Sequence, residues 1–204
     1  LGEARAHWRL GPKAGRQRAK VQVGNPRTTP PFALTARAAA GAVAAIEVVS
    51  GDGQRGVVGT PLARAVVARA TDSLGNPVSG VPIYLRPRTG KADSVVRTGG
   101  DGLASATWTL GTSAGPMRLV ARFDSLPDSA VVTATARPGT ANKIYFATAP
   151  ASGTAGRALP KLVQVVVRDR YGNPVPNATV RFSAAAGAVL PLQGTTDASG
   201  RAST

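Results

Sequence analysis

The sequence predicts an all-β chain made of tandem antiparallel β-sandwiches, one complete and two partial. Turn-forming residues are abundant, with 24 Gly and 16 Pro among 204 residues. Short segments alternate apolar and polar residues, which is the pattern of strands with one buried face. Blocks of sequence also recur at a spacing close to 100 residues, which is the length of one β-sandwich domain.

The recurring blocks divide the chain. The block Gly2–Gly11 (GEARAHWRLG) returns as Gly102–Gly111 (GLASATWTLG), an offset of 100, and Asp72–Val78 (DSLGNPV) returns as Asp169–Val175 (DRYGNPV), an offset of 97. We therefore expect residues 1–40 to be the C-terminal part of one repeat. Residues 41–138 then form a complete repeat, and residues 139–204 form the N-terminal part of the next.

The complete repeat contains seven predicted strands separated by turn signals. In the fifth of them, Ala104, Ala106, Trp108 and Leu110 share one face, and the polar residues Ser105, Thr107 and Thr109 lie on the other. Seven such segments predict two sheets packed face to face. The strands are expected at Ala42–Val49, Leu62–Asp72, Val81–Leu85, Ser94–Arg97, Gly102–Leu110, Met117–Phe123 and Ala130–Ala136.

Trp8 and Trp108 occupy equivalent positions of the Gly2–Gly11 and Gly102–Gly111 blocks. Because they share the phase of the Ala and Leu residues, we interpret both as core anchors between two sheets. A carbohydrate-stacking platform is the less favoured alternative.

Two blocks carry turn chemistry: Gly75, Asn76 and Pro77, and later Gly172, Asn173 and Pro174. Glycine accepts a positive φ, Asn tolerates it, and Pro fixes the exit from the turn. We expect Asp72 and Asp169 to accept hydrogen bonds from the backbone amides of these turns. Calcium binding by these carboxylates is the alternative, and the absence of an Asp-x-Asp cluster disfavours it.

These blocks resemble the bacterial immunoglobulin-like repeats of group 1, which occur in tandem in invasin- and intimin-type surface proteins. The resemblance rests on the Asp-x-x-Gly-Asn-Pro-Val block and on the Gly-x-Ala-x-Ala-x-Trp-x-Leu-Gly block. It implies immunoglobulin-like sandwiches strung end to end as rods on the bacterial cell surface, in an extracellular location, holding an adhesive or enzymatic tip away from the cell. The chain is more basic than such repeats and contains no candidate tip domain, which favours a spacer over an adhesin.

Composition argues against enzymatic chemistry. The chain has one His (His7) and no Cys, so a His-based metal site, a thiolate site and a Cys nucleophile are excluded. We therefore predict no enzyme, no catalytic residue, no metal and no cofactor. No window of 18 consecutive apolar residues occurs, so no membrane span is expected in this segment.

The net charge of +15 is unevenly distributed. Residues 1–40 carry 8 basic and 1 acidic residue (+7), residues 41–138 carry 10 and 7 (+3), and residues 139–204 carry 7 and 2 (+5). The fold does not require the excess in residues 1–40, so its outward strand positions are a candidate surface for an anionic glycan or envelope polymer. The favoured interpretation is nevertheless that the charge serves only solubility, with the anionic partner as the alternative, and no pattern indicates specific nucleic-acid binding. The candidate residues are Arg5, Arg9, Arg16, Arg18 and Lys20.

Neither partial repeat can cover its own apolar face, so each needs further strands. Adjacent repeats or other copies of the same protein are therefore the expected partners, and head-to-tail polymerisation is one way to supply the missing strands. The sequence thus predicts a structural repeat segment of a stalk or fibre that acts as a spacer, with the anionic-polymer binding module as the alternative.

Overall fold

The computed structural model describes residues 3–24, 31–123, 129–159 and 161–204, and in these ranges the chain forms strands and no helix. Within the same ranges, nothing resembles an apolar helix that could cross a membrane. The prediction of an all-β fold is confirmed. The strands are β1 Gly15–Val21, β2 Phe32–Ala38, β3 Val43–Ser50, β4 Gln54–Val57, β5 Val66–Asp72, β6 Pro82–Pro87, β7 Lys91–Ala92, β8 Val95–Arg97, β9 Leu103–Ala106, β10 Trp108–Thr109, β11 Gly115–Arg122, β12 Ser129–Arg137, β13 Lys143–Thr148, β14 Gln164–Arg168, β15 Thr179–Arg181, β16 Gln193–Thr195 and β17 Arg201–Ser203.

Strands β3 to β12 form the middle unit, a sandwich of two sheets. One sheet has the order β3-β5-β9 and the other β4-β12-β11-β6-β8, and β10 and β7 form a separate two-stranded pair. All pairings are antiparallel except that of β4 with β12. The residues that alternate inward from both sheets make one core, whose largest fully buried side chains include Trp108, Ile83 and Leu119.

All seven predicted strands of this unit are present, with informative differences. The segment predicted at Leu62–Asp72 becomes regular only at Val66. The segment predicted at Gly102–Leu110 divides into β9 and β10, because β9 pairs with β5 and β10 pairs with β7. The inward face predicted for this segment is confirmed, since Ala104, Ala106, Trp108 and Leu110 are all buried.

The C-terminal unit, β13 to β17, repeats the first part of the middle unit. Its sheet β13-β14-β17 has the same order as β3-β5-β9, and the pair β15-β16 corresponds to β6-β8. Its buried core is small and consists of Val165, Val167, Val180 and Ala202. Phe146 of β13 is 71% exposed, which shows how much apolar surface this partial sandwich leaves uncovered.

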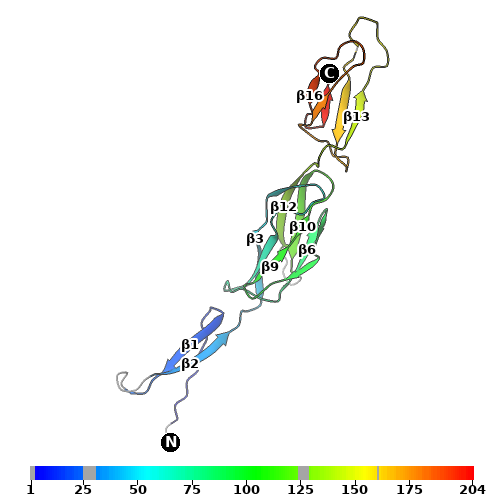
Figure 1. Ribbon diagram of the computed structural model, residues 1–204. Coiled ribbons are helices and arrows are strands. Elements are labelled where there is room, and N and C mark those ends of the chain that lie inside the picture. Colours follow the sequence, from blue (N-terminus) through cyan, green and yellow to red (C-terminus); the bar gives the residue numbers. More distant parts are fainter. Residues whose placement is uncertain (1–2, 25–30, 124–128, 160) are drawn as a thin grey trace.

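The N-terminal unit is the β1-β2 hairpin, which corresponds to β11-β12. Gly15 pairs with Ala38 in it as Gly115 pairs with Ala136 in the middle unit. The three units follow one another in an elongated arrangement, with β1 and β2 at one end and the C-terminal strands at the other (Figure 1).

The expected strand over the Gly2–Gly11 block does not form. No described residue from 3 to 14 lies in a strand, and Trp8 is 39% exposed, in contrast to the inward position expected for it. In the middle unit the equivalent segment pairs with β5 and β7, and no counterpart of those two strands precedes the hairpin among the described residues. The block therefore lacks, among the described residues, the inter-strand hydrogen bonds that keep its equivalent extended.

Candidate functional site: the junctions between units

Asp72 is the last residue of β5, and its carboxylate joins the turn after β5 to the linker that leads into the middle unit. One carboxylate oxygen, Oδ1, accepts hydrogen bonds from the backbone amides of Leu74 and Asn76 at 2.9 and 2.8 Å. The other, Oδ2, accepts from the amide of Gly41 at 2.8 Å. Because Gly41 lies between β2 and β3, Asp72 fixes the linker to the turn of the unit that follows it.

Asn76 extends this cluster into the preceding unit. Its Nδ2 donates to Asp72 Oδ2 at 2.9 Å and to the carbonyl oxygen of Pro12 at 2.8 Å. Its Oδ1 accepts from the amide of Ala14 at 2.8 Å. One side-chain amide therefore donates to and accepts from the loop that precedes β1, which restrains both the separation and the rotation of the two units.

The second junction repeats the first atom for atom. Asn173 Nδ2 donates to the carbonyl oxygen of Thr112 at 2.8 Å, and Asn173 Oδ1 accepts from the amide of Ala114 at 2.8 Å. Asp169 Oδ2 accepts from the amide of Gly139 at 2.9 Å, in the linker between β12 and β13. Pro12 and Thr112 are 100 residues apart, as are Ala14 and Ala114, so the same contact recurs at the period of the sequence repeat.

The carboxylates of both junctions are stabilised in their charged form. The hydrogen bond from the Gly41 amide, followed by that from the Asn76 side chain, lowers the pKa of Asp72 from its ordinary 3.8 to about 2. Burial acts to raise the pKa of Asp169, but hydrogen bonds from the Asn173 side chain and the Gly139 amide outweigh it and hold that pKa below its ordinary value. Each carboxylate is thus an acceptor for amides at both oxygens.

Turn geometry places the asparagines. Gly75 and Gly172 have φ values of 78° and 88°, a conformation that favours glycine, and each turn is closed by a backbone hydrogen bond from the glycine amide to the carbonyl of the preceding Asp. Pro77 and Pro174 follow, and each makes an isolated bridge with the strand that leads into the turn, at Thr71 and Arg168.

Tyr171 adds a packing contact at the second junction. A Cβ built on Gly59 would lie 2.5 Å from Tyr171 Oη, so the ring rests against the backbone of the middle unit where a larger residue would not fit. Arg170 lies over the same ring, 4.4 Å from its centroid. The equivalent residue of the first junction, Leu74, is 65% exposed, so this contact distinguishes the second junction from the first.

The sequence predicted the bonds from the turn amides to the Asp carboxylates but not the reach of Asn76 and Asn173 into the preceding unit. The sequence offered one signal for this contact. Both turns contain an Asn, and a loop precedes the hairpin at equivalent positions of the two repeats, Pro12–Ala14 and Thr112–Ala114. Periodicity within strands carries no information about such contacts.

The candidate anionic-partner residues fall into two groups. Arg16, Arg18 and Lys20 are exposed on one face of β1. Arg5 and Arg9 lie outside any strand, and Arg5 is paired with Glu3 at 2.9 Å, with both side chains largely exposed.

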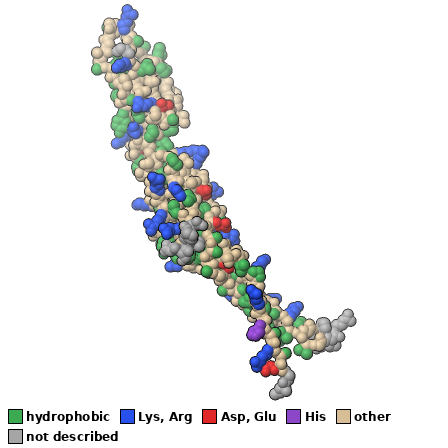
Figure 2. All heavy atoms as spheres, turned by 180° about the vertical axis from the view of Figure 1, so that it is seen from behind, with side chains coloured by type: hydrophobic (Ala, Val, Ile, Leu, Met, Phe, Trp, Pro, Cys, Tyr) green, Lys and Arg blue, Asp and Glu red, His purple; other side chains and the backbone are tan. Residues whose placement is uncertain are grey.

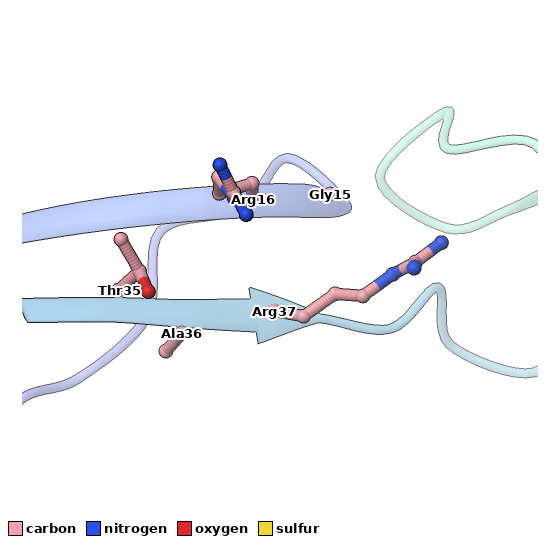
Figure 3. Close-up of a pocket in the computed structure, with 5 residues that line it drawn as sticks. All are labelled: Gly15, Arg16, Thr35, Ala36 and Arg37. Carbon is pink, nitrogen blue, oxygen red and sulfur yellow. The ribbon is translucent and has the colours of Figure 1, made fainter.

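The hairpin also contributes a basic residue that the sequence prediction did not include. Arg37 of β2 lies directly across from Arg16 in the hairpin register. A hollow of about 370 Å³ is lined by both, and the Arg37 side chain points toward the middle unit and away from Arg16 (Figure 3).

The described residues contain no group of three or more His, Asp or Glu side chains suited to a metal ion. In the junctions the oxygens of Asp72 and Asp169 already accept amide hydrogen bonds, as given above. What this arrangement can do is mechanical: it joins successive units through fixed polar contacts.

Comparison with known proteins identifies the family of the C-terminal unit. Residues 145–204, which are 60 of the 204, match the family model described as Bacterial Ig-like domain (group 1). The resemblance to bacterial immunoglobulin-like repeats of group 1 is thereby confirmed for this unit, which includes the Asp169–Val175 block. No curated protein sequence matches the chain.

Several solved structures are similar to this chain. The chain is similar to InvD of Yersinia pseudotuberculosis, with 16% identity and a TM-score of 0.51 over 94% of this chain and 62% of that one. It is also similar to invasin, a bacterial integrin-binding protein, with 15% identity and a TM-score of 0.48 over 88% of this chain and 39% of that one. For the D0-D1 domains of intimin the identity is 19% and the TM-score 0.34, over 79% and 82% of the two chains. The tandem β-sandwich fold is the one seen in InvD, of whose chain this one spans less than two thirds.

Proposed function

We propose that the chain is a segment of a bacterial cell-surface stalk or fibre, in an extracellular location, in which immunoglobulin-like units act as spacers. Each unit adds a fixed rise, and the junctions restrict bending. The units of the proposal are residues 1–40, 41–138 and 139–204. The role is structural and not enzymatic, in keeping with a fold shared with surface proteins such as InvD and invasin.

The observation that carries this proposal is the duplicated asparagine bridge. Asn76 and Asn173 make the same two hydrogen bonds to the preceding unit, each 2.8 Å long. A pair of such bonds stabilises a junction by about 1 to 3 kcal/mol. A flexible linker between independent domains would require no such pair, and the repetition of the pair at both junctions supports a role for the motif in maintaining the geometry between units.

Small-angle X-ray scattering on the monomer peak of a size-exclusion column tests the spacer role. We expect the wild-type chain to scatter as one extended particle. The double variant Asn76→Ala, Asn173→Ala should show a smaller radius of gyration and a smeared pair-distance distribution, because the units then bend freely. Asp197→Ala is the matched control, since Asp197 accepts amide hydrogen bonds from Ser199 and Arg201 within one unit. Identical scattering from wild type and the double variant would remove the basis of the proposal.

We also propose that strands of neighbouring sequence or neighbouring copies complete the partial units, as head-to-tail polymerisation would do. Exposed apolar side chains at the two ends, such as Phe32 at 70% and Phe146 at 71%, support this. A polypeptide of residues 1–204 should therefore associate with rising concentration in light scattering, and a chain that stays monomeric throughout would speak against completion in trans.

A second candidate function is binding of an anionic envelope polymer by the N-terminal hairpin. Its support is the single exposed face shared by Arg16, Arg18 and Lys20 on β1. Replacement of these three residues by Ser should then abolish binding to acidic glycan beads. Binding that ignores the substitutions, or that survives high salt, would exclude this site.

A further inference from the structure

All charged residues within the strands of the middle unit's five-stranded sheet are basic. Its strands β4, β12, β11, β6 and β8 contain six arginines and no acidic residue. All six side chains are exposed, because the residues that alternate with them form the core. Arg88, one residue beyond β6, is exposed as well. The six arginines are Arg55, Arg86, Arg97, Arg118, Arg122 and Arg137.

The opposite face of the same sandwich differs. In the strands β3, β5 and β9 the exposed charged residues are Glu47 and Arg69, which lie directly across from each other. The charged residues of those strands are therefore balanced, and between the two main sheets the basic excess lies in the five-stranded one. Segment totals of charge could not reveal this, because they average the two faces. Figure 2 shows Lys and Arg side chains far outnumbering Asp and Glu along the visible surface.

The strand register spaces these arginines across the sheet. Arg118 of β11 lies opposite Thr133 of β12, and on its other side the amide of Arg88 donates to the carbonyl oxygen of Arg118. Two residues further along β11, Val120 lies opposite Arg86. Neighbouring strands are about 4.8 Å apart and alternate residues along a strand about 6.8 Å. Guanidinium groups thus recur at intervals that suit the charged groups of an extended polymer.

All but one of these side chains lack a polar partner among the described residues. Arg97 donates to the carbonyl oxygen of Gly80. The other arginines of the face form no side-chain hydrogen bond or ion pair with any described residue; Asp124 and Asp128, between β11 and β12, lie outside the described part. The nearby carboxylate of Asp52 accepts hydrogen bonds from the amide and hydroxyl of Thr133 at 2.7 and 2.8 Å.

The face also contains a hollow of about 430 Å³, lined in part by Arg88, Arg118, Thr133 and Thr135. Guanidinium forks bind carboxylate and sulfate groups in two-point contacts, and threonine hydroxyls can bond sugar hydroxyls. The hydroxyl of Thr133 already donates to Asp52 Oδ1, so toward a sugar it can act only as an acceptor, and Thr135 adds a second hydroxyl to the lining of the hollow.

We propose that this face, which we call the arginine face (Arg55, Arg86, Arg88, Arg97, Arg118, Arg122 and Arg137), binds an extended acidic polysaccharide. A nucleic acid fits less well, because Tyr84 is the sole aromatic residue in the five strands and stacking of bases needs several. A second copy of the chain fits less well too, since the chain has 25 basic and only 10 acidic residues. The proposal concerns a binding surface and does not depend on the spacer function.

Titration of the full chain with polygalacturonate, followed by calorimetry, tests the proposal, with neutral dextran as the uncharged probe. We expect the wild-type chain to bind polygalacturonate and not dextran, with affinity that falls as salt rises. The triple variant Arg86→Ser, Arg118→Ser, Arg122→Ser should lose about tenfold or more in affinity. Because these side chains are exposed and have no polar partner in the described part of the chain, circular dichroism and the melting temperature should stay unchanged.

Two comparison variants localise the effect. Arg64→Ser, Arg69→Ser, Arg157→Ser removes the same charge from exposed positions outside the arginine face and should change affinity no more than about twofold. Equal losses in the two triple variants would overturn the proposal, because net charge alone would then explain binding. If affinity for polygalacturonate falls only in the variant Arg16→Ser, Arg18→Ser, Lys20→Ser, the binding site is the hairpin and the proposal is overturned. Tighter binding of single-stranded DNA than of polygalacturonate would overturn the assignment of a polysaccharide as the partner.

Discussion

The side-chain amide of Asn173 donates a hydrogen bond to the carbonyl oxygen of Thr112, 61 residues earlier in the chain, at 2.8 Å. The two residues belong to successive immunoglobulin-like units, and Asn76 makes the corresponding bond to Pro12. A short turn motif therefore serves both to close its own turn and to hold the unit before it.

Stability should depend on pH through Asp72. Its pKa in the folded chain is about 2, below the ordinary 3.8, so the carboxylate binds protons more weakly when folded. Its contribution to stability is therefore complete above about pH 4 and is lost as the pH falls through about 2. The melting temperature of the wild-type chain should drop steeply over this interval.

In Asp72→Asn the drop should be shallower, with Asp169 and the other carboxylates of lowered pKa accounting for what remains. Melting curves at about pH 6, 4, 3 and 2, recorded by circular dichroism, supply the comparison. Parallel pH profiles for the two proteins would show that Asp72 contributes nothing through its charge.

The two tryptophans should differ sharply in their contribution to stability, although their sequence blocks match. Trp108 is fully buried in the core of the middle unit, whereas Trp8 is 39% exposed. Trp108→Ala should lower the free energy of unfolding by about 3 to 5 kcal/mol, and Trp8→Ala by less than about 1 kcal/mol. Urea denaturation of both variants measures this, and similar losses would mean that residues 3–14 are packed as a strand after all.

Trp108→Phe should lower the free energy of unfolding by less than Trp108→Ala does, for two reasons. The indole Nε1 of Trp108 is buried with no hydrogen-bond partner among the described residues. Phenylalanine keeps most of the apolar volume and removes that unsatisfied donor.

The cost in stability of replacing a glycine by Ala should depend on the space around it, even at similar φ. Gly102 and Gly75 have φ values of 73° and 78°. A Cβ at Gly102 would lie 2.8 Å from the carbonyl oxygen of Ala70 and 2.8 Å from Pro77 Cβ, whereas Gly75 has open space. Gly75→Ala should cost about 1 to 2 kcal/mol from backbone strain alone, and Gly102→Ala clearly more. Equal costs in thermal unfolding would indicate that the turn at Gly102 relaxes freely.

Local pattern predicted most of the middle unit. The seven expected strands alternate apolar and polar residues, so their period was visible, and both sheets followed from it. Strand β4 was missed because its four residues, Gln54–Val57, follow a Gly-rich turn and pair in parallel with β12, about 80 residues away. Such a pairing is decided by tertiary contacts and leaves no periodic signature.

The contacts of the candidate site were harder to predict from the sequence. Asn76 and Asn173 occupy turn positions where Asn is common for local reasons, so their reach into another unit could not be told from turn chemistry. The prediction that Trp8 is buried was wrong because an alternating pattern forms a strand only where neighbouring strands pair with it. The arginine face emerged only when the register put residues from five strands on one surface.

The central claim, that the Asn bridges set the geometry between units, is tested most directly by spin-label distances across the second junction. The chain has no Cys, so Ser105→Cys on β9 and Thr179→Cys on β15, both exposed, give labels at chosen sites only. Double electron–electron resonance should give one narrow distance distribution, which Asn173→Ala broadens and the control Asp197→Ala does not. A distribution that is already broad in the labelled wild-type background, and unchanged by Asn173→Ala, would contradict the claim.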